Sequence, residues 1–204
     1  MDSYKLLLNT LAKMLKSRGF MRKGNKFYIT KENNCAIIDF QKERGHEPGE
    51  RTFTINIYIG SERVANFFGS SVKGTPGVEL CHWDERVGYL LPQNKDVWWR
   101  ISDYPDLTQL EKELEQVLVN YCIPEIDNNI SDASLEKTWR ARFSAGIMHF
   151  TEYKFFTALL KSYNRPDWLA LATAFIESPL NKNAKRIALD HLEHLQESVE
   201  EGRN

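Results

Sequence analysis

The sequence predicts an α+β protein, in which an N-terminal helix packs on an antiparallel sheet with following helices, plus an all-helical C-terminal extension. Three observations predict this class. Apolar residues recur at helical spacing in residues 3–17, they alternate with polar residues in residues 51–60, and no strand pattern follows the middle of the chain. The chain is therefore expected to divide into an α+β domain at residues 1–123 and a helical extension at residues 133–204.

The first helix is predicted from apolar side chains at i, i+3, i+4 and i+7 spacing. They are Tyr4, Leu7, Leu8, Leu11, Met14 and Leu15. This spacing places them on one face of a helix. Gly19 then predicts the end of the helix, because glycine readily adopts the left-handed conformation that closes a helix.

Three strands are predicted next, because the apolar period changes to two. Residues 26–31 and 35–42 are short alternating segments joined by the turn residues 32–34. Residues 51–60 form the clearest strand, with isoleucines and a phenylalanine on one face and polar residues on the other. Residues 43–50 hold two glycines and a proline, which predicts an exposed loop.

The pattern is weaker between residues 64 and 101. Residues 64–72 favour another strand, residues 80–91 recover helical spacing, and residues 97–101 favour a last strand. Asp106 with Gln109 predicts the start of a helix, since an acidic side chain there caps the first free backbone N–H groups.

The segment from Ile123 to Asp132 is polar and contains Pro124, which favours a linker. Four helices are expected after it, at residues 134–145, 147–163, 166–177 and 183–200. Pro166 suits a first helical turn, and Pro179 ends the third helix because proline has no N–H to continue the hydrogen bonding. These helices would form a small bundle or two hairpins.

Composition excludes several classes of protein. The chain carries 27 basic and 28 acidic residues, and its formal net charge of −1 gives no overall field to attract nucleic acid or a membrane. Three widely separated cysteines favour a reducing compartment. No apolar stretch reaches the roughly 18 residues of a membrane span. We therefore expect a cytoplasmic protein that does not enter a membrane.

The polar face of the predicted sheet is the candidate binding surface. The opposite, buried face is expected to consist of Phe27, Ile29, Ala36, Ile38, Phe40, Phe53, Ile55, Ile57 and Ile59. The polar face carries donors, acceptors and aromatic rings, unlike the Lys/Glu mixture of a merely solvated face. Binding residues are expected on this face and at its rim: Tyr28, Asp39, Gln41, Asn56, Tyr58, Arg86 and Trp99. An equally open alternative is that the C-terminal helices bury these groups in hydrogen bonds.

Motifs for catalysis and metal binding are missing from the sequence. It has no Gly-rich phosphate loop, no G-x-S-x-G elbow and no H-E-x-x-H helix. Asp39 as a base and Tyr58 as an acid would lack a nucleophile. His191 and His194 have zinc-ligand spacing, but a solvated helix edge explains this spacing better. No catalytic residue, metal ligand or cofactor is assigned, and an enzyme or small-ligand protein with a pocket between sheet and C-terminal helices stays an alternative.

Nucleic-acid binding is a second alternative. Residues 1–31 carry eight lysines and arginines against Asp2 alone, and Phe27 and Tyr28 lie in this segment. Aromatic rings beside cations can stack unpaired bases. The slightly acidic net charge and the absence of a known nucleic-acid motif count against this alternative.

Five short motifs follow one another in the first half of the chain: Gly19–Tyr28, Ile38–Lys42, Phe53–Ile57, Arg86–Gly88 and Asp96–Ile101. Their order and spacing resemble a bacterial family of unknown function, DUF4304, over about residues 1–120. The resemblance implies an α+β fold without established chemistry, and such families often resemble immunity proteins. We therefore expect a non-catalytic, immunity-like module that binds another protein. The sequence does not indicate its oligomeric state.

Overall fold

The computed structural model describes residues 2–43, 51–104 and 106–197. The chain forms two compact units. The first comprises Met1–Glu62 and Ser71–Ser131, and the second comprises Arg63–Ser70 and Asp132–Asn204. The second unit thus includes residues 63–70, a segment that the sequence analysis assigned to the first domain. The predicted loop at residues 43–50 lies outside the described residues except for Glu43.

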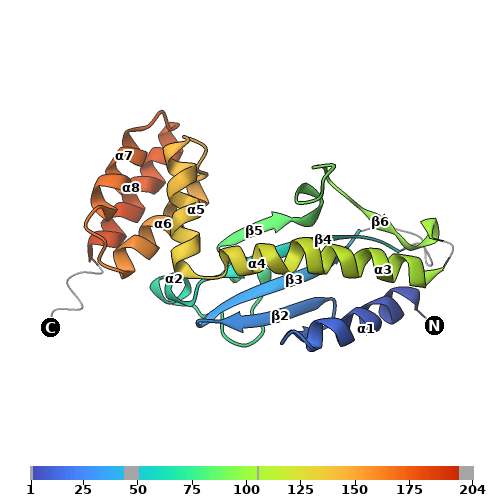
Figure 1. Ribbon diagram of the computed structural model, residues 1–204. Helices are drawn as coiled ribbons and strands as arrows, with labels where there is room; N and C mark the ends of the chain where they lie inside the picture. The colour runs from blue at the N-terminus through green and yellow to red at the C-terminus, as the bar shows by residue number, and fades with distance from the viewer. Residues whose placement is uncertain (1, 44–50, 105, 198–204) are drawn as a thin grey trace. The chain divides into compact units, whose positions relative to one another are not determined.

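An antiparallel sheet forms the centre of the first unit (Figure 1). Its strands are β1 (Met21–Lys23), β2 (Lys26–Lys31), β3 (Asn34–Lys42), β4 (Thr52–Gly60), β5 (Trp83–Arg86) and β6 (Trp99–Arg100). The first five are paired in sequence order, and β6 also pairs with β4. Glu32 and Asn33 join β2 to β3 in left-handed conformations, with φ of 52° and 71°, as two-residue hairpin turns require.

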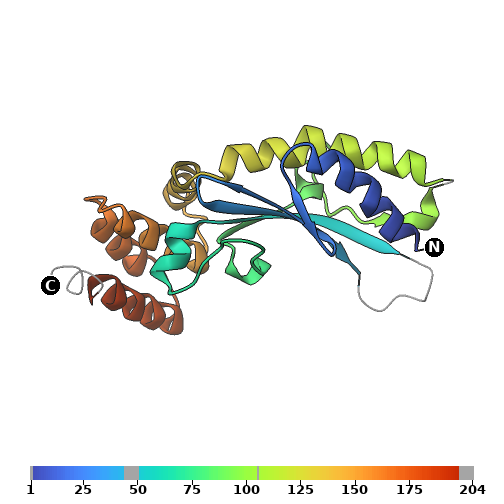
Figure 2. The same cartoon turned by 90° about the horizontal axis from the view of Figure 1, so that it is seen from below.

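Helices α1 (Ser3–Lys16) and α3 (Leu107–Val117) cover the apolar face of this sheet (Figure 2). The ring of Tyr4 on α1 lies edge-on to Phe53 with centroids 5.5 Å apart, and its hydroxyl donates to the carbonyl of Phe40 at 2.7 Å. Trp99 stacks on Phe53 and donates from Nε1 to Glu113 on α3 at 2.8 Å. The predicted apolar face is confirmed: its residues are buried, except that Ile29 is half-buried.

The segment predicted as a linker after Ile123 is helical as far as Asn129 rather than irregular. A π-helical turn (Leu118–Cys122) joins α3 to α4 (Ile123–Asn129). The N–H of Ile123 donates to the carbonyl of Leu118, and this wider turn is how a helix accommodates an irregularity. Pro124 then lies in the first turn of α4, where its missing N–H costs least.

Two further predictions in the weak region are wrong. Residues 64–72 were expected to form a strand, but the helix α2 (Glu62–Phe67) lies there. Residues 80–91 were expected to be helical, but they contain β5 between 3₁₀ turns at Val78–Leu80 and Val87–Tyr89. Pairing with β4 explains the second difference, because Asn56 faces Arg86 and Ile59 faces Trp83, and these sheet hydrogen bonds outweigh local periodicity.

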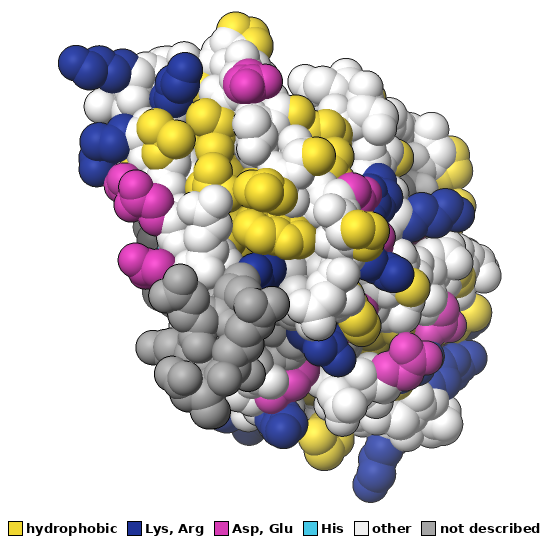
Figure 3. Space-filling view, turned by 90° about the vertical axis from the view of Figure 1, so that its left-hand side faces the viewer, with side chains coloured by type: hydrophobic (Ala, Val, Ile, Leu, Met, Phe, Trp, Pro, Cys, Tyr) yellow, Lys and Arg dark blue, Asp and Glu magenta, His cyan; other side chains and the backbone are white. Residues whose placement is uncertain are grey.

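The four predicted C-terminal helices are confirmed in the second unit. They are α5 (Asp132–Ser144), α6 (Phe150–Ser162), α7 (Trp168–Glu177) and α8 (Lys182–Glu197). Tyr153 and Phe175 stack with centroids 4.1 Å apart at the centre of their core, beside Ala172, Ile176 and Ala188. Figure 3 shows apolar side chains gathered on the face of the molecule that it draws. In the second unit, Leu169, Ile187 and Leu189 are exposed. Among the described residues, no helix has the length and apolar character to cross a membrane.

Candidate functional site

A row of polar side chains crosses the second face of the sheet. Strand register aligns Lys26, Asp39, Asn56 and Arg86 on four neighbouring strands. Lys26 Nζ lies 2.8 Å from Asp39 Oδ2, and Asn25 Nδ2 donates to Asp39 Oδ1 at 2.8 Å. The centre of the predicted polar face is therefore an ion-paired and hydrogen-bonded row rather than a set of independent side chains.

The middle of this row is buried. Asp39 and Asn56 are each only 5% exposed, and Tyr28 and Thr54 are also buried. The connection from Ser71 to Trp98 within the same unit contributes to this cover. Thr54 Oγ1 donates to the carbonyl of Val97 at 2.8 Å, and Val72 packs so closely on Gly60 that an added Cβ would lie 2.7 Å from it.

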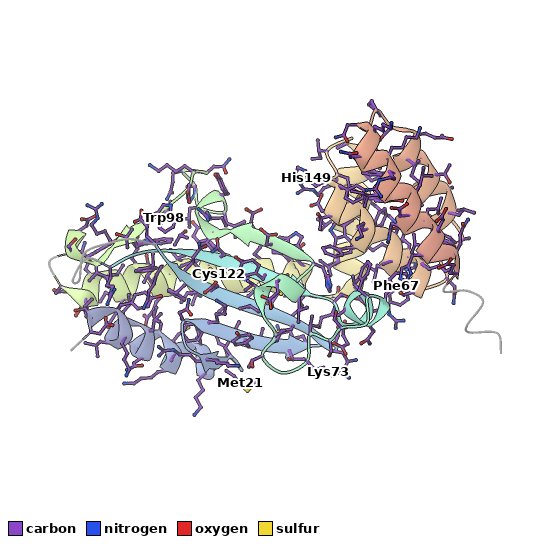
Figure 4. The ribbon with its side chains drawn as sticks, turned by 180° about the vertical axis from the view of Figure 1, so that it is seen from behind. Met21, Phe67, Lys73, Trp98, Cys122 and His149 are labelled. Carbon is purple, nitrogen blue, oxygen red and sulfur yellow. The ribbon has the colours of Figure 1, made fainter. Side chains whose placement is uncertain are left out.

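One end of the row is accessible. Arg86 Nη1 donates to both carboxylate oxygens of Asp96 at 2.9 Å, and Arg86 Nε reaches Asn56 Oδ1 at 3.3 Å. The Arg86 guanidinium also lies 5.5 Å from the ring centroid of Trp98, whose Nε1 donates to Asp96 at 3.0 Å. Trp98 is 37% exposed, and Figure 4 shows it on the long connection beside the sheet. We call Arg86, Asp96 and Trp98 the Arg86 cluster.

The hydrogen bonds of Arg86 favour the ionised form of Asp96. They hold the pKa of the Asp96 carboxyl below its ordinary value, with a smaller contribution from the Trp98 indole N–H. Asp96 is therefore ionised at neutral pH and keeps the guanidinium in place. Asn56 Nδ2 also donates to Gln41 Oε1 at 2.7 Å, which connects the exposed Gln41 to the same network.

Trp99, a predicted site residue, does not join the others. It pairs in register with Phe53 and is buried on the apolar face, as described above. Adjacent strand residues point to opposite faces, so the exposed partner in this pair is Trp98. The pairing of Trp99 with Phe53 places both side chains on the apolar face. This pairing could not be predicted, because the register of a two-residue strand is not evident from the sequence.

The two predicted tyrosines differ in accessibility. Tyr28 is buried and Tyr58 is half-buried, and the two side chains flank Ile37 in the strand register next to the Asp39 row. Burial raises the pKa of both phenols, and the negative charge of Asp39 raises it further. Both hydroxyls therefore stay protonated to a higher pH than an ordinary phenol does.

Metal-ligand geometry is not found in the described part of the chain: no group of three or more His, Cys, Asp or Glu side chains is placed to hold an ion. His191 is buried, and its Nε2 lies 2.9 Å from Thr157 Oγ1. His194 instead packs edge-on to Phe67 with centroids 5.4 Å apart. The two histidines thus contact different residues, Thr157 and Phe67, and do not form the pair of zinc ligands that their spacing in the sequence would allow.

Comparison with known proteins gives a family and nothing more. The model of the family described as "Domain of unknown function (DUF4304)" matches residues 11–128. Neither the curated proteins nor the solved structures contain a significant match to this chain. The matched segment includes the polar row and the Arg86 cluster and ends before α5.

Proposed function

We propose that this chain, which belongs to the DUF4304 family, is a non-catalytic, immunity-like protein-binding module of the cytoplasm. The observation that carries the proposal is the Arg86 cluster, an arginine fixed between a carboxylate and a partly exposed indole. Arginine, tryptophan and tyrosine are the residue types that contribute most binding energy in protein interfaces. The cluster therefore offers a contact surface without requiring a nucleophile, metal or cofactor.

Fixed geometry favours this role. Binding costs free energy when flexible side chains are immobilised, and a side chain that is already held in place avoids part of that cost. Arg86 has three partners in the free protein: Asp96, Asn56 and the ring of Trp98. Tyr89, which is 50% exposed, lies on the same connection and adds a second aromatic side chain to the proposed surface.

The predicted binding residues take two roles under this proposal. Gln41, Tyr58 and Arg86 retain exposed atoms and would contact the partner together with Trp98. Asp39 and Asn56 are buried and would position the others through hydrogen bonds. The alternative of an enzyme or small-ligand protein stays a prediction, because no observed group of side chains favours a particular reaction.

Affinity capture with matched variants tests the proposal. The tagged protein, Trp98→Ala and Val119→Ser are each used on lysate of the source organism, with and without nuclease. Val119 is a suitable control because it lies in the same unit and is also 37% exposed. We expect the wild type and Val119→Ser to retain the same stoichiometric protein, and Trp98→Ala to weaken its binding by about 30-fold, the effect of a central interface residue.

Three results would contradict the proposal. A partner that Trp98→Ala retains at full affinity would exclude the Arg86 cluster as the contact surface. A capture that disappears on nuclease treatment would favour nucleic acid instead. A capture without any stoichiometric protein would favour the small-ligand alternative.

A further inference from the structure

A groove runs between α1 and β1 on the first unit, away from the residues of the Arg86 cluster. It consists of two depressions of about 440 Å³ each, and Arg22 lines both of them. Lys5, Ala12 and Lys16 form the wall on α1, where their spacing places them along one side of the helix. Met21 belongs to the opposite wall, and Figure 4 labels it where the chain has left α1. We call this feature the α1–β1 groove.

The α1–β1 groove is strongly basic. Lys5, Lys16, Arg22 and Lys42 line it, and none of these four forms an ion pair with a carboxylate among the described residues. Among the described residues that line it, Asp2 is the acidic one, and its carboxylate accepts a hydrogen bond from the Tyr4 N–H at 3.1 Å. Four cations at one surface, without carboxylate partners in the described part of the chain, favour an anionic ligand.

Arg22 is held in place at the centre of the groove. Its Nε donates to the carbonyl of Gly24 and its Nη1 donates to Asn9 Oδ1, both at 2.8 Å. The Nη2 group has no acceptor within the described residues, so it is available to a carboxylate. Partial burial lowers the pKa of this guanidinium, which indicates a weakly hydrated cation that an anion can approach at lower desolvation cost.

The aromatic side chains near the groove argue against nucleic acid. Base stacking needs exposed ring faces, but Tyr4, Phe20, Phe27 and Tyr28 are all buried. The exposed apolar side chain is Met21, at 58% exposure, and methionine adapts its shape to apolar partner side chains. The combination of cations with an exposed thioether fits a peptide better than it fits unpaired bases.

We propose that the α1–β1 groove binds an acidic peptide segment of a partner protein in extended form. Lys5 and Lys16 are separated by about 16 Å along the helix axis at 1.5 Å per residue. An extended peptide spans that distance with about five residues. The preferred segment therefore carries two carboxylates about five residues apart and an apolar residue between them. The proposal involves none of the Arg86 cluster and stands whether or not that cluster binds a partner.

Fluorescence anisotropy with a defined probe tests this proposal. The probe is a labelled decapeptide with glutamates at its second and seventh positions and a leucine between them, measured at about 50 mM salt, where surface charges are weakly screened. Lys5 and Lys16 are exposed, so Lys5→Gln and Lys16→Gln are expected to fold normally. Each should weaken binding about three-fold and the double variant about ten-fold.

Lys112→Gln is the matched control, because Lys112 is also an exposed lysine on a helix of the same unit but lies on α3, outside the groove. It should leave the affinity for the peptide unchanged. Equal losses in Lys112→Gln and in the groove variants would overturn the proposal, as would the absence of peptide binding by the wild type. Tighter binding of a single-stranded RNA with the same charge, lost in the groove variants, would replace the peptide by nucleic acid.

Discussion

The two compact units bury polar side chains in different ways. In the first unit, the buried Asp39 carboxylate contacts two polar side chains, Lys26 and Asn25. In the second unit, His191 lies among aromatic rings, 5.6 Å from Tyr153 and 6.1 Å from Phe68 between centroids. The hydroxyl of Tyr153 has no hydrogen-bond partner in the described structure. We therefore expect the stability of the first unit to depend on the side chains that contact Asp39. We expect the stability of the second unit to depend on pH.

The largest expected effect is the pH dependence of the second unit. Burial lowers the pKa of His191 to about 4, and the charges of Lys154 and His194 contribute. The unfolded chain binds this proton near pH 6.5, so between pH 6.5 and 4 the unfolded state holds more protons than the folded state. The neutral His191 ring makes its full contribution to the free energy of unfolding above pH 6.5. About 2–3 kcal/mol of that free energy should be lost as the pH falls to 4.

Hydrogen exchange measured by mass spectrometry at pH 7 and pH 4.5 checks this prediction. Protection in α6 and α8 should fall at the lower pH by more than protection in β3 and β4. His191→Gln preserves a hydrogen-bonding group near Thr157 and should lose most of this difference. Equal pH dependence in the variant would show that other groups cause the acid sensitivity.

Replacement of Asp39 should have the next largest effect. Asp39→Ala removes the buried carboxylate that pairs with Lys26, while Asn25 keeps its hydrogen bond to the Phe40 carbonyl, and we expect a loss of about 1–2 kcal/mol in the free energy of unfolding. Urea denaturation of the full chain measures it. Asp127→Ala is the control, since it breaks a solvent-exposed ion pair with Lys31 and should cost less than about 0.5 kcal/mol. Unchanged stability in Asp39→Ala would assign the row to binding rather than to structure.

The smallest expected effect has the opposite sign. Tyr153→Phe removes a buried hydroxyl that lacks a partner in the described structure and keeps the ring stacked on Phe175. The free energy of unfolding should rise by about 1 kcal/mol, because the folded state no longer contains a desolvated polar group. Thermal denaturation at pH 7 measures the change. A loss of stability would instead show that the hydroxyl bonds a buried water molecule.

The candidate site was only partly predictable from sequence. The alternation in β2, β3 and β4 correctly placed Tyr28, Asp39, Asn56 and Tyr58 on the face opposite Ile38, Ile55 and Ile57. It did not show that the connection from Ser71 to Trp98 helps to cover the middle of that face. It also favoured Trp99 over Trp98, since the register of β6 depends on pairing with a strand more than forty positions away.

The α1–β1 groove was also only partly predictable from the sequence. The excess of cations in residues 1–31 is evident in the sequence, but its meaning depends on which of them find partners. Lys26 pairs with Asp39, and Lys31 pairs with Asp127 from α4. Lys5, Lys16 and Arg22 keep their charges unpaired among the described residues and line one groove. The positions of these lysines and arginines in the sequence do not show which of them pair with a carboxylate and which line the groove.

The sequence by itself determined the fold class, the long helices and the central strands, because helical and alternating apolar patterns specify which faces must be buried. It also indicated the family, since order and spacing of short motifs are properties of the chain. Only the tertiary structure decided that residues 80–91 contain a strand, that the helix continues through Pro124, and which polar side chains remain accessible. These features depend on hydrogen bonds and packing between distant segments, whose free energies exceed the small local preferences of each segment.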